Sequence, residues 1–223
     1  MDLLPRYTHI VNPKLKHIYL SFNDKGDLII KSPDVPQKRI EQLLIKKSAW
    51  INKSRQNFQE KKGKILDFRN TLELYYRGKA YPVKLNKHHQ KRIKFSFDGE
   101  IFSLFYQDYD EVLFQKHIDA FYKKEAKECI PQYVKKWAEI MQLAPHKISF
   151  RKTKRQWGSC SAKNDLSFNT MMMKLPPYVM EYIVVHELAH IKHKHHQKAF
   201  WQLVQSYFPK YRTAIKELKT YTT

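Results

Sequence analysis

Apolar and polar residues alternate in several short stretches of the first half of the chain, which is the pattern of a half-buried strand. The stretch from Lys16 to Phe22 alternates in this way, a turn signal follows at Asp24 to Gly26, and Leu28 to Ile30 continues the pattern. A strand, a turn and a second strand together predict a hairpin. On the same grounds we expect hairpins at 16–30, 72–85 and 91–106, with turns at 24–26, 77–79 and 98–99.

Elsewhere the apolar residues recur every three or four positions, which is the spacing of a helix with one buried face. This spacing predicts a helix from about Pro36 and a long helix from about 110 to 141, which Pro131 is expected to kink. Pro176 and Pro177 then precede a strongly apolar helix. The remaining expected elements are strands at 147–153 and 166–170 and helices at 178–192, at 198–207 and from Pro209.

Strands followed by helices, without a repeated strand–helix alternation, are typical of an α+β fold. We therefore expect N-terminal β-hairpins and long helices packed with a compact C-terminal core. The expected division lies between a β-rich region with one helix, residues 1–108, and a core formed by residues 109–223.

The stretch from Val184 to His190 places two histidines four residues apart, with a glutamate directly after the first. Residues i and i+4 lie on one face of a helix, so His186 and His190 can hold one metal ion, and Glu187 can accept a proton from water beside it. This HExxH spacing is a zinc signature and predicts metal-assisted hydrolysis. The competing interpretation is an amphipathic helix with ordinary histidines, but polar groups buried on so apolar a helix require a partner.

A catalytic zinc ion has a third protein ligand and leaves one position for water. A straight helix would carry His193 about 10 Å along the axis from His186, so the chain must turn back after His190. His196 has the offset of the third histidine in the HExxHxxGxxH pattern. We expect His196 to be the third ligand, with His195 as the alternative. His193 occupies the glycine position of that pattern, and histidine tolerates the left-handed conformation better than most residues.

Composition bears on the binding partners of the protein and on its cellular compartment. Lys and Arg number 42 and Asp and Glu 21, and a net charge of +21 attracts nucleic acid, nucleotides or anionic membranes, although a dispersed excess is also typical of a solvated surface. No apolar run reaches the roughly 18 residues that a membrane span requires. The chain start lacks the pattern of a secretory signal, and two cysteines, Cys129 and Cys160, are too few for a disulfide framework. We therefore expect a cytoplasmic protein without a membrane span.

Several motifs together resemble the YgjP-like family of predicted zinc metallopeptidases. They cover about 145–218 and comprise Trp157-Gly-Ser-Cys-Ser161, Asn169, Pro176-Pro177, the HELAH segment, His196 and Phe200-Trp201. The N-terminal hairpins and the long helix resemble that family more loosely. The family is in turn similar to the SprT-like and Wss1-like proteases, in which a compact zincin core is paired with DNA-associated substrates.

The resemblance implies a zincin-like core in which Zn²⁺ is bound by His186, His190 and His196 and Glu187 is the catalytic base. It also implies a polypeptide substrate, including polypeptides associated with nucleic acid. The sequence departs from the family pattern at Gln156, where an arginine is common before the tryptophan, and after the third histidine, where a small residue and a proline are common and Gln197 and Lys198 stand here.

These departures bear on substrate contacts near residues 155–160. We expect Arg155, Trp157, Ser159 and Asn169 to contact substrate, and a strand within 157–169 to pair with an extended peptide. The alternatives are that Trp157 packs behind the zinc helix and that Asn169 caps a turn. Tyr182, four residues before the first histidine, would either orient that ligand or pack in the core.

Two other functions fit the same motif. A metal-dependent nucleoside-triphosphate pyrophosphatase would use the basic charge to hold phosphates, since the chain has no P-loop: its Gly-Lys pairs lack the required spacing and Ser/Thr. A zinc-stabilised nucleic-acid-binding module is the third interpretation. It would gain if Cys160 or His193 supplied a fourth ligand, because structural zinc sites are closed by four protein ligands.

Overall fold

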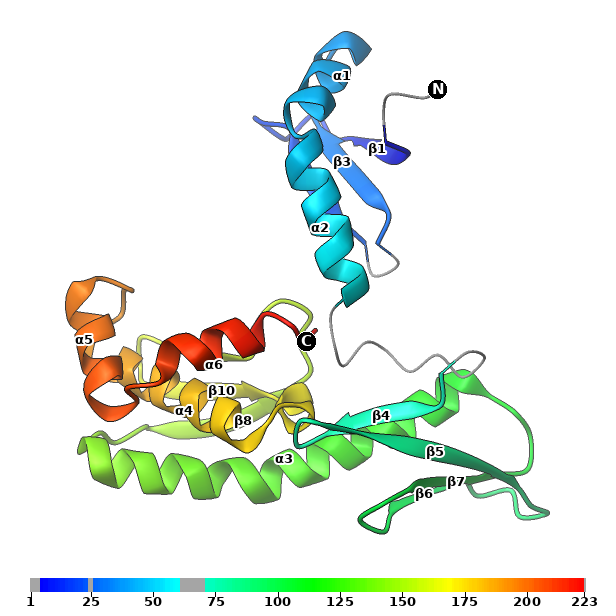
Figure 1. Cartoon of the computed structure of the whole chain (residues 1–223), viewed down its shortest axis with the longest axis vertical. Coiled ribbons are helices and arrows are strands. Elements are labelled where there is room, and N and C mark those ends of the chain that lie inside the picture. Colours follow the sequence, from blue (N-terminus) through cyan, green and yellow to red (C-terminus); the bar gives the residue numbers. More distant parts are fainter. Residues whose placement is uncertain (1–4, 24–25, 61–70, 223) are drawn as a thin grey trace. The chain divides into compact units, whose positions relative to one another are not determined.

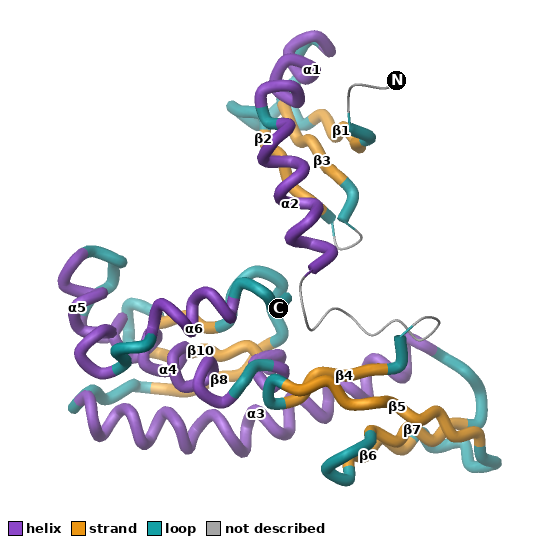
Figure 2. The backbone as a smooth tube through the Cα atoms, viewed as in Figure 1, coloured by secondary structure: helices purple, strands orange, loops and turns teal. Residues whose placement is uncertain are grey.

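The computed structural model describes residues 5–23, 26–60 and 71–222, with the backbone alone at 57–60. The chain forms two compact units, residues 1–61 and residues 62–223. The boundary expected after residue 108 falls inside the second unit. Figure 1 labels most of the helices and strands, and Figure 2 shows the same backbone coloured by secondary structure.

The first unit is a three-stranded sheet with two helices. Its elements are β1 (Tyr7–Val11), β2 (Tyr19–Phe22), β3 (Leu28–Ser32), α1 (Gln37–Lys46) and α2 (Ser48–Glu60). The strand order is β1-β3-β2, with β2 antiparallel and β1 parallel to β3. The hairpin predicted from the alternation is thus confirmed, although Asp24 and Lys25 of its turn lie outside the described residues. The core consists of Leu28, Ile30, Ile40, Leu44 and Ile51, all fully buried.

The second unit begins with a four-stranded sheet. Its strands are β4 (Glu73–Tyr76), β5 (Lys79–Lys87), β6 (Lys94–Phe97) and β7 (Phe102–Tyr106), in the order β4-β5-β7-β6. Both predicted hairpins are confirmed, and they join through a parallel pairing of β5 with β7. The turn between β4 and β5 uses Arg77 and Gly78 at positive φ, as a two-residue hairpin turn requires.

The long helix α3 (Glu111–Met141) forms the base of the second unit. Asp110 begins it: the Oδ1 atom accepts hydrogen bonds from the backbone N–H groups of Val112 and Leu113. The helix continues through Pro131 and ends at Gln142, which adopts the left-handed conformation. Its buried residues recur every three or four positions from Phe114 to Met141. Helix α3 contacts the helix that carries His186 and His190, and it therefore packs behind the candidate site.

The remaining elements are a second three-stranded sheet and the helices that follow it in the chain. They are β8 (Lys147–Arg151), β9 (Gly158–Cys160), β10 (Asp165–Asn169), the short 3₁₀ helix η1 (Thr170–Lys174), α4 (Pro177–Lys192), α5 (Lys198–Tyr207) and α6 (Tyr211–Leu218). The strand order β8-β10-β9 makes β9, which the sequence pattern did not predict, an outer strand beside α4. The expected α+β class is confirmed. Among the described residues, no helix combines the length and the apolar character that crossing a bilayer requires.

Candidate metal centre

Helix α4 carries the HExxH segment and is buried nearly all round. Pro177 occupies its first turn, where a missing N–H costs nothing. Val184, Val185, Leu188 and Ala189 are fully buried, so both flanks of the helix pack against neighbouring elements. The apolar packing of α4 therefore fixes the positions of the polar residues in the segment.

Three histidine side chains converge at the C-terminal part of α4. One ring nitrogen from each of His186, His190 and His196 lies within 4.8 Å of the other two. The Nε2 atoms of His186 and His196 are 3.0 Å apart. Nitrogen ligands at about 2.0–2.1 Å from a tetrahedral zinc ion are about 3.3 Å apart, so this spacing is close to the one zinc imposes.

Partners on the opposite ring nitrogens leave the Nε2 atoms facing the cluster. The Nδ1 of His190 lies 3.0 Å from the carbonyl oxygen of His193 and donates to it when protonated, while the hydroxyl of Tyr182 lies 3.3 Å from the Nδ1 of His186. Metal-binding histidines usually have such a partner, which fixes the orientation of the ring. Burial, and then the neighbouring histidines, lower the pKa of His186 to about 3. This imidazole is therefore neutral, as a metal ligand must be.

Glu187 lies beside the histidine cluster and is only 6% exposed. Burial raises the pKa of this carboxyl group to about 8. Its side chain rests directly on Gly158 of β9: a Cβ atom at that position would lie 2.6 Å from Oε1 and 2.7 Å from Cγ of Glu187. The glycine of the Trp-Gly-Ser-Cys segment is thus the residue that leaves room for the carboxylate.

The loop between α4 and α5 brings His196 back to the helix. The chain leaves α4 at His193 with φ −129° and ψ 102°, so this residue is extended and does not use the left-handed conformation that histidine tolerates. An extended residue whose carbonyl oxygen faces His190 replaces the glycine turn. Lys194 anchors the loop, because its Nζ donates to the carbonyl oxygen of Ser161 at 2.9 Å and to Oδ1 of Asn164 at 2.7 Å.

Two aromatic side chains of α5 pack against the histidine rings. Phe200 is fully buried and stacks on His190, with ring centroids 4.5 Å apart. Trp201 stacks on His196 at 5.7 Å and on Tyr211 of α6 at 5.4 Å. Helix α5 therefore braces the third histidine, which is itself exposed. The Phe-Trp pair was visible in the sequence, but its contact with the rings was not.

The residues expected to contact substrate occupy different positions. Asn169 is 2% exposed, and its Nδ2 donates to the carbonyl oxygens of Thr153 and Gln156 while its Oδ1 caps η1. Trp157 is half-buried against the core, Ser159 lies in β9, and Arg155 is exposed in the loop before it. Asn169 thus organises the loop that precedes β9, which corresponds to the capping alternative.

The remaining candidate ligands lie outside the cluster. His195 is exposed, and Cys160, whose pKa is raised by burial, has its Sγ 3.7 Å from Nζ of Lys194. Within the described part of the chain, the group of possible metal ligands contains His186, His190 and His196 and no fourth residue. Three imidazoles fit a catalytic metal ion better than a closed structural site.

The chain is similar to several known proteins. The sequence model of the YgjP-like metallopeptidase domain matches residues 16–221. A stretch of 56 residues, 25% of the chain, is 43% identical to the UTP pyrophosphatase of Escherichia coli (strain K12) and spans 34% of that protein's length.

Two crystal structures of metallopeptidase zymogens are also similar. Abylysin of Pyrococcus abyssi has 21% identity and a TM-score of 0.38, and the match covers 42% of this chain and 99% of that chain. Jannalysin of Methanocaldococcus jannaschii has 23% identity and a TM-score of 0.35, and the match covers 39% and 93%.

Proposed function

Because the chain belongs to the YgjP-like metallopeptidase family, it is a metal-dependent hydrolase, and we propose that the metal is zinc and that the bond hydrolysed is a peptide bond. His186, His190 and His196 would hold the ion through their Nε2 atoms. When bound, zinc supplies Lewis acidity, which polarises the scissile group and makes water easier to deprotonate. Tyr182 and the carbonyl oxygen of His193 keep two of the rings in the orientation that this requires.

Glu187 is the proposed general base. It follows a ligand on α4, and Gly158 on one side and the buried helix on the other restrict the positions of its carboxylate. A base must be ionised to accept a proton from water, and a nearby cation favours the ionised form of a buried carboxyl group. Burial raises the pKa of Glu187, and a zinc ion held by the neighbouring histidines would favour the ionised carboxylate. Glu187 would therefore act as a base when zinc is bound.

The position of β9 supports a polypeptide substrate, and this observation carries the proposal. β9 pairs with β10 on one side and has no neighbouring strand on the other within the described residues. An extended peptide can add to such an edge through main-chain hydrogen bonds. Because Gly158 of β9 contacts Glu187, a peptide on this edge would pass next to the base. Ser159 and Trp157 would contact it along the same edge.

Hydrolysis of a nucleoside triphosphate is the second candidate. It is supported by the 43% identity to the UTP pyrophosphatase over 56 residues. It is also supported by Arg151, an exposed residue whose Nη2 donates to Oγ of Ser159, so that a guanidinium group lies beside β9. Arginine side chains form strong, often bidentate hydrogen bonds with phosphate oxygens. The free cysteines Cys129 and Cys160 suit either function in a reducing, cytoplasmic compartment.

The experiment is a substrate panel with the zinc-loaded protein. Unfolded polypeptides with a fluorescent reporter, protein–DNA complexes and UTP are incubated in parallel with the wild type, with Glu187→Gln and with the exposed control Glu139→Gln. We expect peptide cleavage that is lost in Glu187→Gln, retained in Glu139→Gln, abolished by a chelator and restored by zinc. Pyrophosphate release from UTP without peptide cleavage would select the second candidate. Zinc binding without any turnover would leave a non-enzymatic zinc protein.

A further inference from the structure

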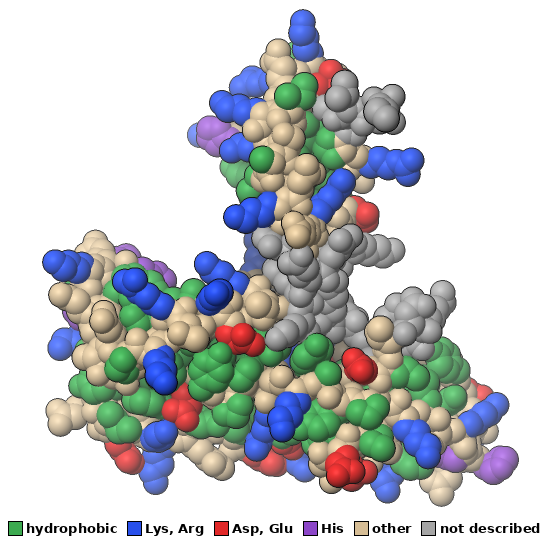
Figure 3. All heavy atoms as spheres, in the orientation of Figure 1, with side chains coloured by type: hydrophobic (Ala, Val, Ile, Leu, Met, Phe, Trp, Pro, Cys, Tyr) green, Lys and Arg blue, Asp and Glu red, His purple; other side chains and the backbone are tan. Residues whose placement is uncertain are grey.

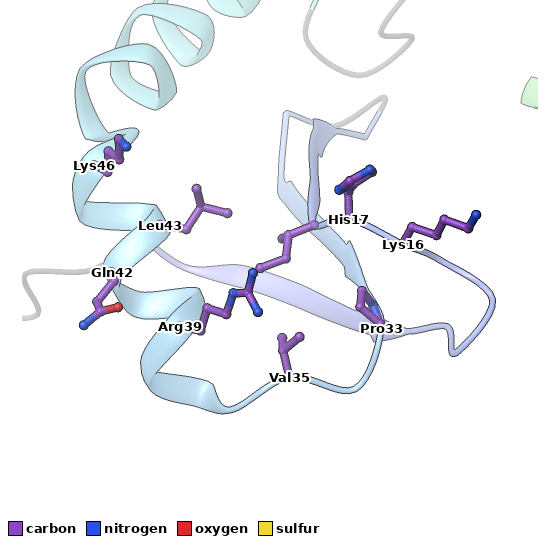
Figure 4. Close-up of a pocket in the computed structure, with 9 residues that line it drawn as sticks. Lys16, His17, Pro33, Val35, Arg39, Gln42, Leu43 and Lys46 are labelled. Carbon is purple, nitrogen blue, oxygen red and sulfur yellow. The ribbon is translucent and has the colours of Figure 1, made fainter.

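The first unit contains a groove that is separate from the histidine cluster. It lies between α1, the chain just before β2 and the segment after β3, and its volume is about 440 Å³. Figure 4 shows Arg39 extending from α1 into this space, with Lys16 and His17 on the far side. The volume is within the range of about 300–1,000 Å³ that is usual for ligand sites. The groove is thus large enough to hold part of a ligand.

The rim of the groove is basic and its floor is apolar. Lys16, Arg39 and Lys46 line it together with His17, and none of its lining residues is acidic. No carboxylate among the described residues forms an ion pair with these three cations. Lys and Arg side chains are also spread over the visible face of this unit (Figure 3). Cations without acidic partners around a groove attract an anionic ligand.

The apolar residues of the groove indicate which kind of anionic ligand it would bind. Ile18, Val35 and Leu43 line it and are half-buried, so they offer a surface to a flat or apolar group. His17 lines the same groove with an exposed imidazole ring, on which a base can stack. Basic side chains beside an exposed aromatic ring form the combination that binds single-stranded nucleic acid, through phosphates and stacked bases respectively.

We propose that this groove binds a single-stranded segment of nucleic acid, with Lys16, Arg39 and Lys46 on the phosphates and His17 against a base. This role is independent of the hydrolytic reaction. It concerns only residues of the first unit, so its failure would not affect the assignment of the histidine cluster, and the reverse also holds.

The test measures binding of a fluorescein-labelled oligothymidylate of about 12 nucleotides, within the usual site sizes of about 4–16, to the full chain by fluorescence anisotropy. Arg39→Gln/Lys46→Gln is compared with Arg55→Gln/Lys53→Gln, which removes the same two charges from α2 outside the groove. Each phosphate contact to a single strand contributes about 0.7 to the slope of log affinity against log salt. We therefore expect the groove variant to lower that slope by about 1.4 and to weaken binding about tenfold near physiological salt.

Further arms separate the groove from general charge attraction. His17→Ala should weaken binding about fivefold or more, because a stacked base contributes about 1–3 kcal/mol. Zinc content and thermal unfolding of all variants should stay at wild-type values. Equal losses in the two double variants, absence of binding by the wild type, or displacement of the probe by UTP or polyglutamate as readily as by unlabelled oligonucleotide would each overturn the proposal.

Discussion

Replacement of Gly158 by alanine tests the contact on which the proposed base depends. The added methyl group would lie 2.6 Å from Oε1, 2.7 Å from Cγ and 2.8 Å from Cδ of Glu187. Ordinary van der Waals contacts are about 3.5–4.0 Å, so three atoms of one side chain must move by roughly 0.7 Å or more. Because Glu187 is only 6% exposed, its carboxylate has little space into which it can move.

The displacement should lower turnover while the chain stays folded. A misplacement of about 1 Å at a reacting group can lower the rate about 10²-fold, which is about 2.7 kcal/mol of transition-state stabilisation. Overpacking of a buried site costs about 1–3 kcal/mol of unfolding free energy. We therefore expect Gly158→Ala to remain folded, to bind zinc as the wild type does, and to lose about two orders of magnitude in kcat with a smaller change in KM.

The assay combines zinc stoichiometry, chemical unfolding and turnover on whichever substrate the panel identifies. Gly99→Ala is the control for general destabilisation. A Cβ atom at Gly99 meets nothing within 4 Å, but the φ of +108° is unfavourable for alanine, at a cost of about 1–3 kcal/mol. This control should lose stability without losing turnover.

Two results would refute the reasoning. Wild-type kcat in Gly158→Ala would mean that the contact does not position the base. Loss of zinc together with turnover would mean that the glycine supports the histidine cluster and not Glu187 alone.

Three further predictions concern other residues. Lys194→Met removes the anchor of the loop that carries the third histidine, so zinc affinity should fall about 10–100-fold in competition with a chelating dye; unchanged affinity would show that α5 alone holds the loop. His196→Ala should abolish stoichiometric zinc binding while His195→Ala retains it, measured by metal analysis, and the opposite result would exchange the two assignments. Lys174 is 5% exposed and burial lowers its pKa to about 8, so the folded state loses this proton at lower pH than the unfolded state does. The unfolding free energy in urea should therefore rise between about pH 8 and pH 10, by at most about 3 kcal/mol, and this rise should be absent in Lys174→Met.

Local chemistry made several features predictable from sequence. The spacing of His186 and His190 places both on one helix face, because the period of a helix is fixed by covalent geometry. The turn at Gly78 and the Asp110 cap of α3 follow from backbone preferences that act within a few residues. Elements formed by such short-range rules were predicted close to where the structure has them.

Features that depend on distant contacts were not predictable in the same way. β9 has three residues, too few for a periodic pattern, and it exists because β10 and α4 lie beside it. The parallel pairings of β1 with β3 and of β5 with β7 join segments that no local rule connects. The helix predicted from Pro36 divides at Lys47 into two, which the apolar spacing alone did not reveal.

The sequence by itself therefore determined the zinc-signature helix, its two histidines and the glutamate between them, since these depend on helix geometry within one turn. Only the tertiary structure decided which later histidine joins them, because Lys194 and α5 together fold the loop so that His196, and not His195, faces the cluster. It also decided where the glutamate points, because Gly158, distant in sequence, packs against it. A loop conformation and a contact between separate elements depend on the free energy of the whole packed core, and a local pattern does not contain that information.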